Sequence, residues 1–404
     1  MDAIVVLLIS LSMAFFLSRL CVHLSLPSLL GPLLTGIIFS IPWVQELVPI
    51  SNLSGLFAVF SDLGIILLLF YIGLKINIHR IKKSSRDVTF ITLLSTFIPV
   101  VLTFLLVLWL GHSWIAALSI AAVLAVSDES VSLVLLDEAK LVRTKVGQLI
   151  ISTGVLDDVL SVLFLGILTI VFASSAGAGL GILRLLLEVA ILVVFLVLLH
   201  YVIIPFTHRY YTQTHFRHKY DLFTVTLILV LLLATFSHYL HFGFAFGALL
   251  AGIIVRSSFD GSDRRGLVEE REIDDMFRTV TFGFVILFFF IAIGLNIDFS
   301  SLNWLLIASL VIIGLFGKWV GALLGFRLAE GKSSFRLANL IGWGLGSRGA
   351  MALIVLEIAR AHDIIPANLF SSVIFVAIIT TIIAPIVFRF FVKQRAHHFR
   401  SHHL

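Results

Sequence analysis

The sequence is short of charged residues and of cysteine. Only 13% of its 404 residues are Asp, Glu, Lys or Arg, whereas a soluble domain carries about a quarter. Hydrophobic residues make up 60% and the mean hydropathy is +1.13, so we predict an all-α polytopic membrane protein. The single cysteine, Cys21, excludes a disulfide bond within the chain.

Long polar segments are also lacking. The longest are residues 207–220, 256–278 and the tail after Arg389, so no soluble regulatory domain is expected. The first residues lack the basic segment of a cleaved signal peptide, so we expect them to open the first span. A net charge of +5 does not indicate a nucleic-acid partner, because the basic residues lie in short loops between apolar runs.

Apolar runs follow one another along the chain, and their lengths predict about thirteen transmembrane helices. They lie at about 3–22, 28–48, 56–76, 88–111, 114–136, 146–173, 181–205, 221–240, 242–255, 279–297, 303–326, 337–358 and 367–388. Every odd-numbered run ends in a loop with Lys or Arg, whereas the other loops hold only Arg184 and Arg360. By the positive-inside rule, the N-terminus is expected outside and the C-terminus in the cytoplasm.

Two phrases of similar sequence suggest an internal repeat. Residues 67–78 and 286–298 both contain apolar and aromatic residues followed by Gly-Leu and then Asn-Ile. In the predicted topology they leave the membrane on opposite sides, as in an inverted-topology repeat. The alternative is that two helix ends have similar composition without common origin.

The most unusual intramembrane residues are two adjacent carboxylates, Asp157 and Asp158, in the apolar run 146–173. A charged side chain at the bilayer centre costs at least ~2.5 kcal/mol, so a pair there indicates a functional site. Neighbouring side chains on a helix point about 100° apart, so one carboxylate can face a cavity while the other meets a second helix. A pair kept only for helix packing is the alternative.

Two apolar runs are interrupted at equivalent places. Polar residues fill five of the six positions from 127 to 132, including Ser127, Asp128 and Glu129, and such a segment must line a cavity or be unwound. In the run 337–358, glycines and Arg348 take the corresponding position. Paired interruptions in two halves predict a transporter site, although tight packing alone would also explain the glycines.

One lysine lies inside an apolar run. Lys318 is deep in residues 303–326, and a buried ammonium needs a buried carboxylate or loses its proton. Its predicted partner is Asp157 or Asp158. The alternative is a lysine whose side chain reaches the cytoplasmic interface.

These motifs together resemble the monovalent cation/proton antiporter superfamily, and within it bacterial sodium/proton antiporters of the NhaA and NapA type. The resemblance runs from about residue 27 to 385. It rests on five matches: the double aspartate Asp157-Asp158, the core lysine Lys318, the two broken-helix motifs Ser127-Asp128 and Arg348-Gly349, and the proline- and glycine-containing phrase from Pro27 to Gly36. The chain departs from many relatives at Ala350, where they carry Glu, and at the additional acid Glu129.

For the fold, the resemblance implies two inverted-topology repeats with crossed, broken helices. It implies an ion-translocation core at about 56–173 and 279–388 and a dimerisation scaffold at about 1–50 and 181–255. A homodimer in the lipid of the cell membrane is expected. No catalytic residue and no cofactor is expected, since Na⁺ (or Li⁺, K⁺) and H⁺ are the substrates.

For the site, the resemblance implies that a proton and a cation compete at the pair Asp157-Asp158, with Asp158 as the carboxylate that binds either one. Ser127 and Asp128 are expected to complete the oxygen shell of the cation, with Glu129 as an accessory candidate. Lys318 is expected to couple charge by pairing with Asp157 while no cation is bound. Arg348 and Asp128 are expected to offset the helix dipoles at the two breaks. The exchange is then electrogenic, with two protons for one Na⁺.

Three alternatives stay open from the sequence. They are a K⁺/H⁺ antiporter of the same superfamily, a cation channel on this scaffold, and a sodium-coupled solute symporter of related fold. A channel needs no proton counterflow, and a symporter needs no proton-binding pair of carboxylates. A soluble enzyme has no support, because the sequence contains no nucleophile triad, phosphate loop or Cys/His metal set.

Overall fold

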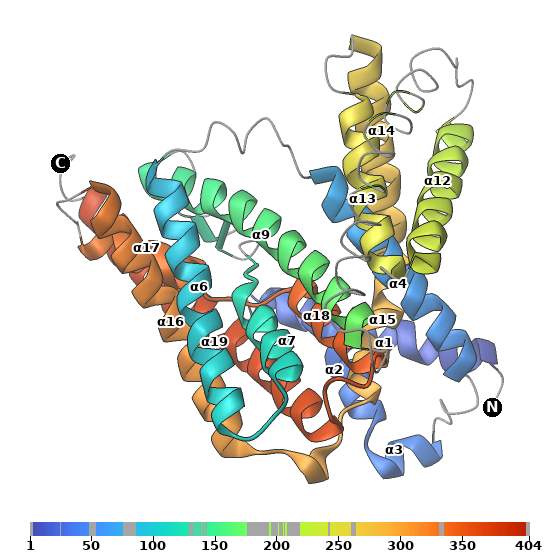
Figure 1. Ribbon diagram of the computed structural model, residues 1–404, viewed down its shortest axis with the longest axis horizontal. Coiled ribbons are helices and arrows are strands. Elements are labelled where there is room, and N and C mark those ends of the chain that lie inside the picture. Colours follow the sequence, from blue (N-terminus) through green and yellow to red (C-terminus); the bar gives the residue numbers. More distant parts are fainter. Residues whose placement is uncertain are drawn as a thin grey trace. The chain divides into compact units, whose positions relative to one another are not determined.

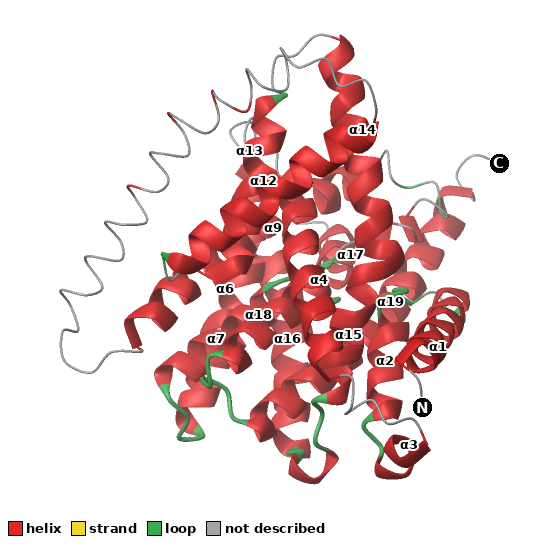
Figure 2. Ribbon diagram, turned by 90° about the vertical axis from the view of Figure 1, so that its right-hand side faces the viewer, coloured by secondary structure: helices red, strands yellow, loops and turns green. Residues whose placement is uncertain are grey.

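The computed structural model describes most of the chain, and everything it describes is helix, turn or loop (Figure 2). The described residues are 3–24, 26–47, 54–75, 86–128, 144–175, 219–240, 243–259, 264–330 and 335–400, with single positions 132, 133, 135, 136, 139, 141, 194, 201, 205 and 207. The all-α prediction is confirmed. Most of the predicted span 181–205 falls outside the described residues.

The long helices agree with the predicted spans within a few residues, except that α19 continues twelve residues beyond the predicted end at 388 (Figure 1). They are α1 (Ala3–His23), α4 (Ser54–Lys75), α6 (Arg86–Trp109), α9 (Lys145–Ser175), α12 (Lys219–Tyr239), α16 (Trp304–Glu330) and α19 (Ala367–Arg400). Among the described residues, seven segments are long and apolar enough to cross a membrane: they lie in these helices except α9, with Val268–Leu295 as the seventh, and shorter apolar helices add to them. The total of about thirteen spans stays a prediction.

The shorter helices fill the remaining runs. They are α2 (Leu30–Phe39), α3 (Pro42–Leu47), α7 (Trp114–Ala125), α13 (Gly243–Ser258), α14 (Arg264–Val280), α15 (Ile286–Leu295), α17 (Phe335–Gly344) and α18 (Ala350–Ala361). A π-helical turn at Thr281–Val285 joins α14 to α15. One expectation was wrong: the polar stretch 256–278 is largely the helix α14 and not a loop.

The reason for that difference is the amphipathic pattern of α14. Ile273 and Phe277, four residues apart, are buried on one face of the helix. On another face, Asp274 forms an ion pair with Lys75 at 2.5 Å. Tertiary packing on the apolar face makes this polar segment helical.

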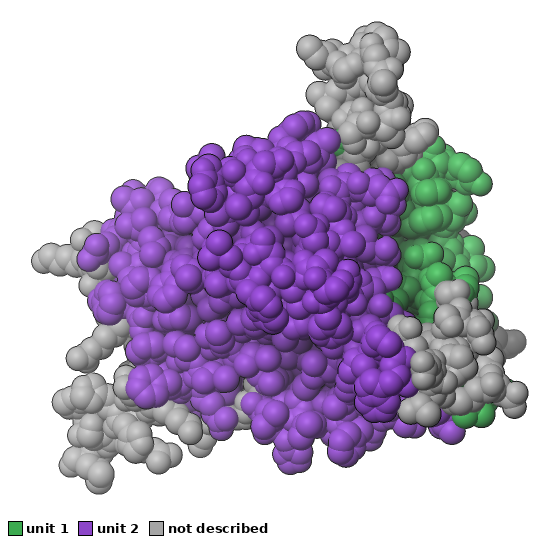
Figure 3. Space-filling view, turned by 90° about the horizontal axis from the view of Figure 1, so that it is seen from below, with its two compact units in different colours: residues 1–6, 47–78, 165–292 green, residues 7–46, 79–164, 293–404 purple. Residues whose placement is uncertain are grey.

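The chain divides into two compact units, coloured in Figure 3. One comprises residues 1–6, 47–78 and 165–292, and the other comprises residues 7–46, 79–164 and 293–404. These units are compact regions of the structure, whereas the predicted core and scaffold are distinguished by their roles in transport. The division into core and scaffold therefore stays a prediction.

In the first unit, α4 and α13 pack with their backbones close together. A Cβ atom on Gly73 would lie 3.0 Å from the Cα atom of Gly252, so only glycine allows this approach. Toward the other end of α4, the rings of Phe60 and Phe288 stack at 4.8 Å between centroids. Close backbone packing thus joins the predicted repeat phrase in α4 to α13.

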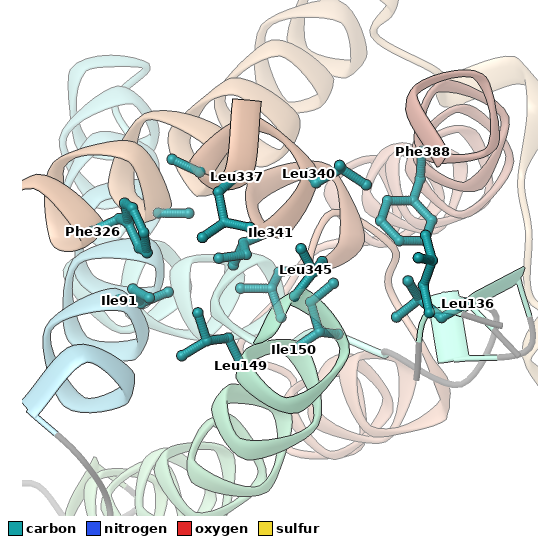
Figure 4. Close-up of a cluster of buried hydrophobic side chains, with 14 of the residues drawn as sticks. Ile91, Leu136, Leu149, Ile150, Phe326, Leu337, Leu340, Ile341, Leu345 and Phe388 are labelled. Atoms are coloured by element: carbon teal, nitrogen blue, oxygen red, sulfur yellow. The ribbon is translucent and has the colours of Figure 1, made fainter. Parts of the chain in front are cut away.

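In the second unit, α6 and α16 run antiparallel in close contact. Cβ atoms on Gly317 and Gly325 would lie 3.1 Å from Pro99 and 2.6 Å from Ile91, and Gly321 contacts Ser95 between them. Apolar side chains from α6, α9, α16, α17 and α19, together with Leu136 and its neighbours, form one buried cluster (Figure 4). Its labelled members are Ile91, Leu136, Leu149, Ile150, Phe326, Leu337, Leu340, Ile341, Leu345 and Phe388.

Two helices of the second unit are interrupted where the sequence predicted it. The helix α7 ends at Ala125 and Val126 is extended, while α17 and α18 are separated by residues 345–349. The two extended segments are joined: the backbone N–H of Asp128 donates to the carbonyl of Ser347 at 2.9 Å, and the Ser347 hydroxyl donates to the carbonyl of Asp128. The predicted pair of broken helices is confirmed.

Candidate functional site

Asp157 lies in the middle of α9, and its side chain is only 3% exposed. Its carboxylate accepts four hydrogen bonds from described residues. Thr96 Oγ1 donates to Oδ1 at 2.6 Å. Oδ2 accepts from the Ser127 N–H at 3.0 Å, from the Ser127 hydroxyl, and from Lys318 Nζ at 3.1 Å. These donors satisfy a carboxylate that would otherwise be very costly to bury.

Lys318 is completely buried in α16. Its ammonium lies 3.1 Å from Oδ2 of Asp157 and 2.5 Å from Oγ of Ser127. The predicted pairing with a buried carboxylate is confirmed, and the alternative of a lysine reaching the interface is wrong. On both sides of Lys318, glycines of α16 lie in close contact with α6. These contacts hold α16 in register with α6 and so position the ammonium.

Asp128 lies at the crossing of the two breaks. A Cβ atom on Gly349 would approach within 2.7 Å of Cγ of Asp128, so the acidic side chain rests directly on the glycine backbone. Its neighbour Ser127 is buried and reaches the carboxylate of Asp157 with both its N–H and its hydroxyl. The unwound segment after α7 thus supplies hydrogen bonds that a continuous helix would use internally.

Arg348 is also buried, with 3% exposure, in the break between α17 and α18. Its Nη1 donates to the carbonyl of Gly346 at 3.0 Å and its Nη2 to the carbonyl of Gly314 at 2.8 Å. Gly346 follows the C-terminal end of α17, where a helix carries partial negative charge. The arginine therefore places a positive charge at this helix end. Within the described residues, its Nε has no hydrogen-bond partner.

Two predicted residues cannot be placed in the same way. Glu129 lies outside the described residues, and of Asp158 the structure describes only the backbone within α9. Their roles stay predictions. Among the described residues, no group of three or more His, Cys, Asp or Glu side chains is arranged to hold a metal ion. The described oxygens around Asp157 come from hydroxyl groups and one carboxylate, which suit a hard monovalent cation as cargo.

Sequence reasoning missed Thr96. Its side chain is 1% exposed and donates to the oxygen of Asp157 that Lys318 does not contact. A signal was present in the run 88–111, where hydroxyl residues recur at helical spacing within apolar sequence. That signal is weak, because a threonine in an apolar helix commonly bonds its own backbone.

A polytopic helical fold with two broken helices, joined beside a buried lysine–carboxylate pair, defines a secondary transporter. The chain belongs to the sodium/hydrogen exchanger family, whose transmembrane model matches residues 6–394. It is 26% identical to the Na⁺/H⁺ antiporter of Enterococcus hirae, over 93% of this chain and 94% of that protein. It is 24% identical to the Na⁺/H⁺-K⁺ antiporter GerN of Bacillus cereus, over 91% of this chain and 90% of that protein.

Among solved structures, the chain is similar to the sodium proton antiporter MjNhaP1 from Methanocaldococcus jannaschii. The TM-score is 0.65 at 17% identity, and the match covers 96% of both chains. This likeness establishes the fold. The family match and the named relatives confirm the resemblance to the cation/proton antiporters.

Proposed function

We propose that this protein is a secondary active antiporter that exchanges Na⁺ (or Li⁺) for H⁺ across the cell membrane. The observation that carries the proposal is the position of the Lys318 ammonium. It lies between Oγ of Ser127 and Oδ2 of Asp157, and so a monovalent cation already occupies an oxygen site in the membrane core. The names of the relatives agree with this assignment.

In the exchange cycle, Na⁺ takes the place of the ammonium at Asp157. The displaced Lys318 loses its ion pair with Asp157, which had favoured the charged form of the lysine, and the buried ammonium releases its proton. On the opposite side of the membrane, Na⁺ leaves, the lysine binds a proton and the ion pair forms again. The lysine thus carries one proton outward for each Na⁺ that moves inward, or the reverse.

A second proton is assigned to Asp158. If both Asp158 and Lys318 exchange protons against one Na⁺, each cycle moves one net charge. The membrane potential then drives the exchange, with ~2.3 kcal/mol per charge for every 100 mV. Asp128 and Arg348 remain in place and offset charge at the two breaks, with Glu129 as an accessory acid.

Alternating access is proposed to come from movement of the predicted core against the predicted scaffold in a homodimer within the lipid bilayer. The proposed orientation places the N-terminus outside and the C-terminus in the cytoplasm. Basic loops after the odd-numbered runs support this orientation. Labelling of the single cysteine, Cys21, would not test this orientation, because its side chain is buried.

The experiment that tests this function measures cation-induced dequenching of a pH-sensitive dye in proteoliposomes that hold a proton gradient. Na⁺, Li⁺ and K⁺ are added in turn to the parent and to Asp158→Asn. Asp62→Asn, which changes an exposed acid in α4, is the matched control. The proposed exchange is supported if Na⁺ and Li⁺ both dequench the dye, if Asp158→Asn abolishes this response, and if Asp62→Asn retains it.

K⁺/H⁺ exchange is the second candidate, because the Bacillus cereus relative is named a Na⁺/H⁺-K⁺ antiporter. A response to K⁺ alone would assign the protein to that activity. A Na⁺ flux that proceeds without proton counterflow would assign it to the channel class and contradict the antiporter.

A further inference from the structure

The carboxylate of Asp157 uses its two oxygens differently. Oδ2 accepts three hydrogen bonds, two from Ser127 and one from Lys318. Oδ1 accepts one described hydrogen bond, from the hydroxyl of Thr96 at 2.6 Å. A carboxylate offers about four lone-pair sites, so Oδ2 is crowded and Oδ1 keeps capacity for a further partner.

The hydroxyl of Thr96 is turned away from its own helix by its neighbours. A threonine in a helix commonly donates to the carbonyl four residues earlier, as Thr92 does to Val88 at 2.8 Å. For Thr96 that carbonyl belongs to Thr92, and it already accepts from the Ser95 hydroxyl at 3.1 Å. Thr96 therefore donates to Asp157 and not to α6.

The packing of α6 on α16 fixes this hydroxyl in space. Gly317 packs on Pro99 and Gly321 on Ser95, so two backbone contacts lie on either side of Thr96. Lys318 lies between the same two glycines on the facing helix. Thr96 and Lys318 thus approach Asp157 from one closely packed helix pair, and each contacts a different oxygen of the carboxylate.

We propose that Thr96 supplies an oxygen ligand to the transported cation, in addition to the residues of the double-aspartate and broken-helix motifs. A hydroxyl is both a donor and an acceptor. While Lys318 holds Asp157, Thr96 donates its proton to Oδ1. When a cation displaces the ammonium from Oδ2 and is also bound by Oδ1, the O–H group rotates and a lone pair of Oγ1 faces the ion. No movement of helix α6 is needed for this change.

This inference rests on the proposed cation exchange and adds a ligand that no motif of the sequence contains. Hard cations prefer oxygen ligands, and loss of one such ligand weakens binding. Thr96→Val keeps the shape of the side chain and removes the hydroxyl. Thr96→Ser keeps the hydroxyl and removes a methyl group. Comparison of the two variants separates the ligand from the packing.

The experiment measures the apparent KM for Na⁺ in proteoliposomes and the rise in Tm that Na⁺ produces in the purified protein. We expect Thr96→Val to raise the KM about tenfold, which corresponds to ~1.4 kcal/mol, and to reduce the Na⁺-dependent rise in Tm. The charge moved per cycle stays unchanged, because Lys318 is intact. Thr96→Ser is expected to remain within about threefold of the parent KM.

Thr92→Val is the matched control, since Thr92 is equally buried on α6 and its hydroxyl bonds only within the helix in the contacts described. It should keep the parent KM. If Thr96→Val fails to fold, Thr96→Ala removes the same hydroxyl with less bulk and takes its place.

Three results would overturn the assignment. An unchanged KM and Tm response in Thr96→Val would show that the hydroxyl does not contact the ion. A lower KM would show that it only stabilises the ion-free carboxylate. A parent protein that neither exchanges Na⁺ nor gains stability from Na⁺ would remove the proposed function itself, and this ligand with it.

Discussion

Arg348 and Gly314 are joined across the second unit: Nη2 of the arginine donates to the glycine carbonyl at 2.8 Å. Gly314 lies about one helical turn before Lys318 in α16. The second arm of the same guanidinium holds the carbonyl of Gly346, beyond the end of α17. One planar group therefore connects the break in the second half of the chain to the helix that carries the lysine.

This connection predicts that lysine cannot replace the arginine. Arg348→Lys has one ammonium on a flexible stem and cannot match the fixed fork that reaches two carbonyls. Because a buried carbonyl left without a donor costs about 1–3 kcal/mol, we expect a lower Tm and slower exchange. Thermal unfolding of the purified protein measures the first effect. Arg271→Lys, at an exposed position on α14, is the control, and equal Tm values for both variants would contradict the connection.

The ion pair in the core predicts a specific pattern of stability. Lys318→Met leaves the carboxylate of Asp157 buried without its cation, and breaking a buried pair in this way costs about 3–5 kcal/mol. Adding Asp157→Asn removes the unpaired charge, so the double variant should recover part of the lost Tm. Both variants should lose electrogenic exchange, measured as current from adsorbed proteoliposomes. A double variant less stable than Lys318→Met would argue against the pair.

The crossing of the breaks predicts that Gly349 tolerates no side chain. Its backbone is extended and any residue could adopt it, so the restriction is steric. In Gly349→Ala the new methyl group would meet the side chain of Asp128, 2.7 Å from Cγ, and would force the two segments apart. We expect at least a tenfold loss of exchange rate, since small displacements of catalytic or binding groups can cost ~100-fold.

Gly283→Ala is the matched control for that substitution. A Cβ atom at Gly283 would meet nothing within 4 Å, so the variant should exchange at the parent rate. Exchange in Gly349→Ala at the rate of this control would show that Asp128 can move aside without loss.

A buried hydroxyl near the site predicts a stabilising substitution. Thr153 lies one turn before Asp157 on α9, is completely buried, and its hydroxyl has no partner among the described residues. Thr153→Val keeps the shape and removes a polar group whose burial costs about 1–3 kcal/mol. We expect a Tm above that of the parent in thermal unfolding. A Tm that falls instead would mean that the hydroxyl is used in the folded protein.

The main features of the fold and part of the site were predictable because they place charged residues and glycines where a lipid-facing helix would have apolar side chains. Charges and glycines in apolar runs identified both helix breaks, and the depth of Lys318 in its run identified a buried ion pair. The residue pattern alone left the choice between Asp157 and Asp158 as partner open, and only the family resemblance assigned it to Asp157. The choice depends on the rotation of α9 relative to α16, which periodicity alone does not give.

Thr96 and α14 could not be predicted for different physical reasons. Thr92 and Thr96 have the same local sequence signal, and only the occupied carbonyl of Thr92 and the neighbouring α9 direct one of them to Asp157. The helix α14 is polar in composition, and its buried face is evident only when Ile273 and Phe277 are packed in the first unit. Both features depend on tertiary contacts between residues far apart in sequence.

Ser127 and Asp128 are adjacent, and this adjacency has a thermodynamic consequence. The first bonds the carboxylate of Asp157 and the second bonds Ser347 in the other broken segment. Binding at the carboxylate and the joining of the two segments are therefore linked equilibria, and linkage is reciprocal. If joining of the two segments changes the affinity of the carboxylate for a cation by some factor, cation binding changes the equilibrium between joined and separated segments by the same factor. Hydrogen exchange at the amide of Asp128, measured against Na⁺ concentration, would report that coupling free energy directly.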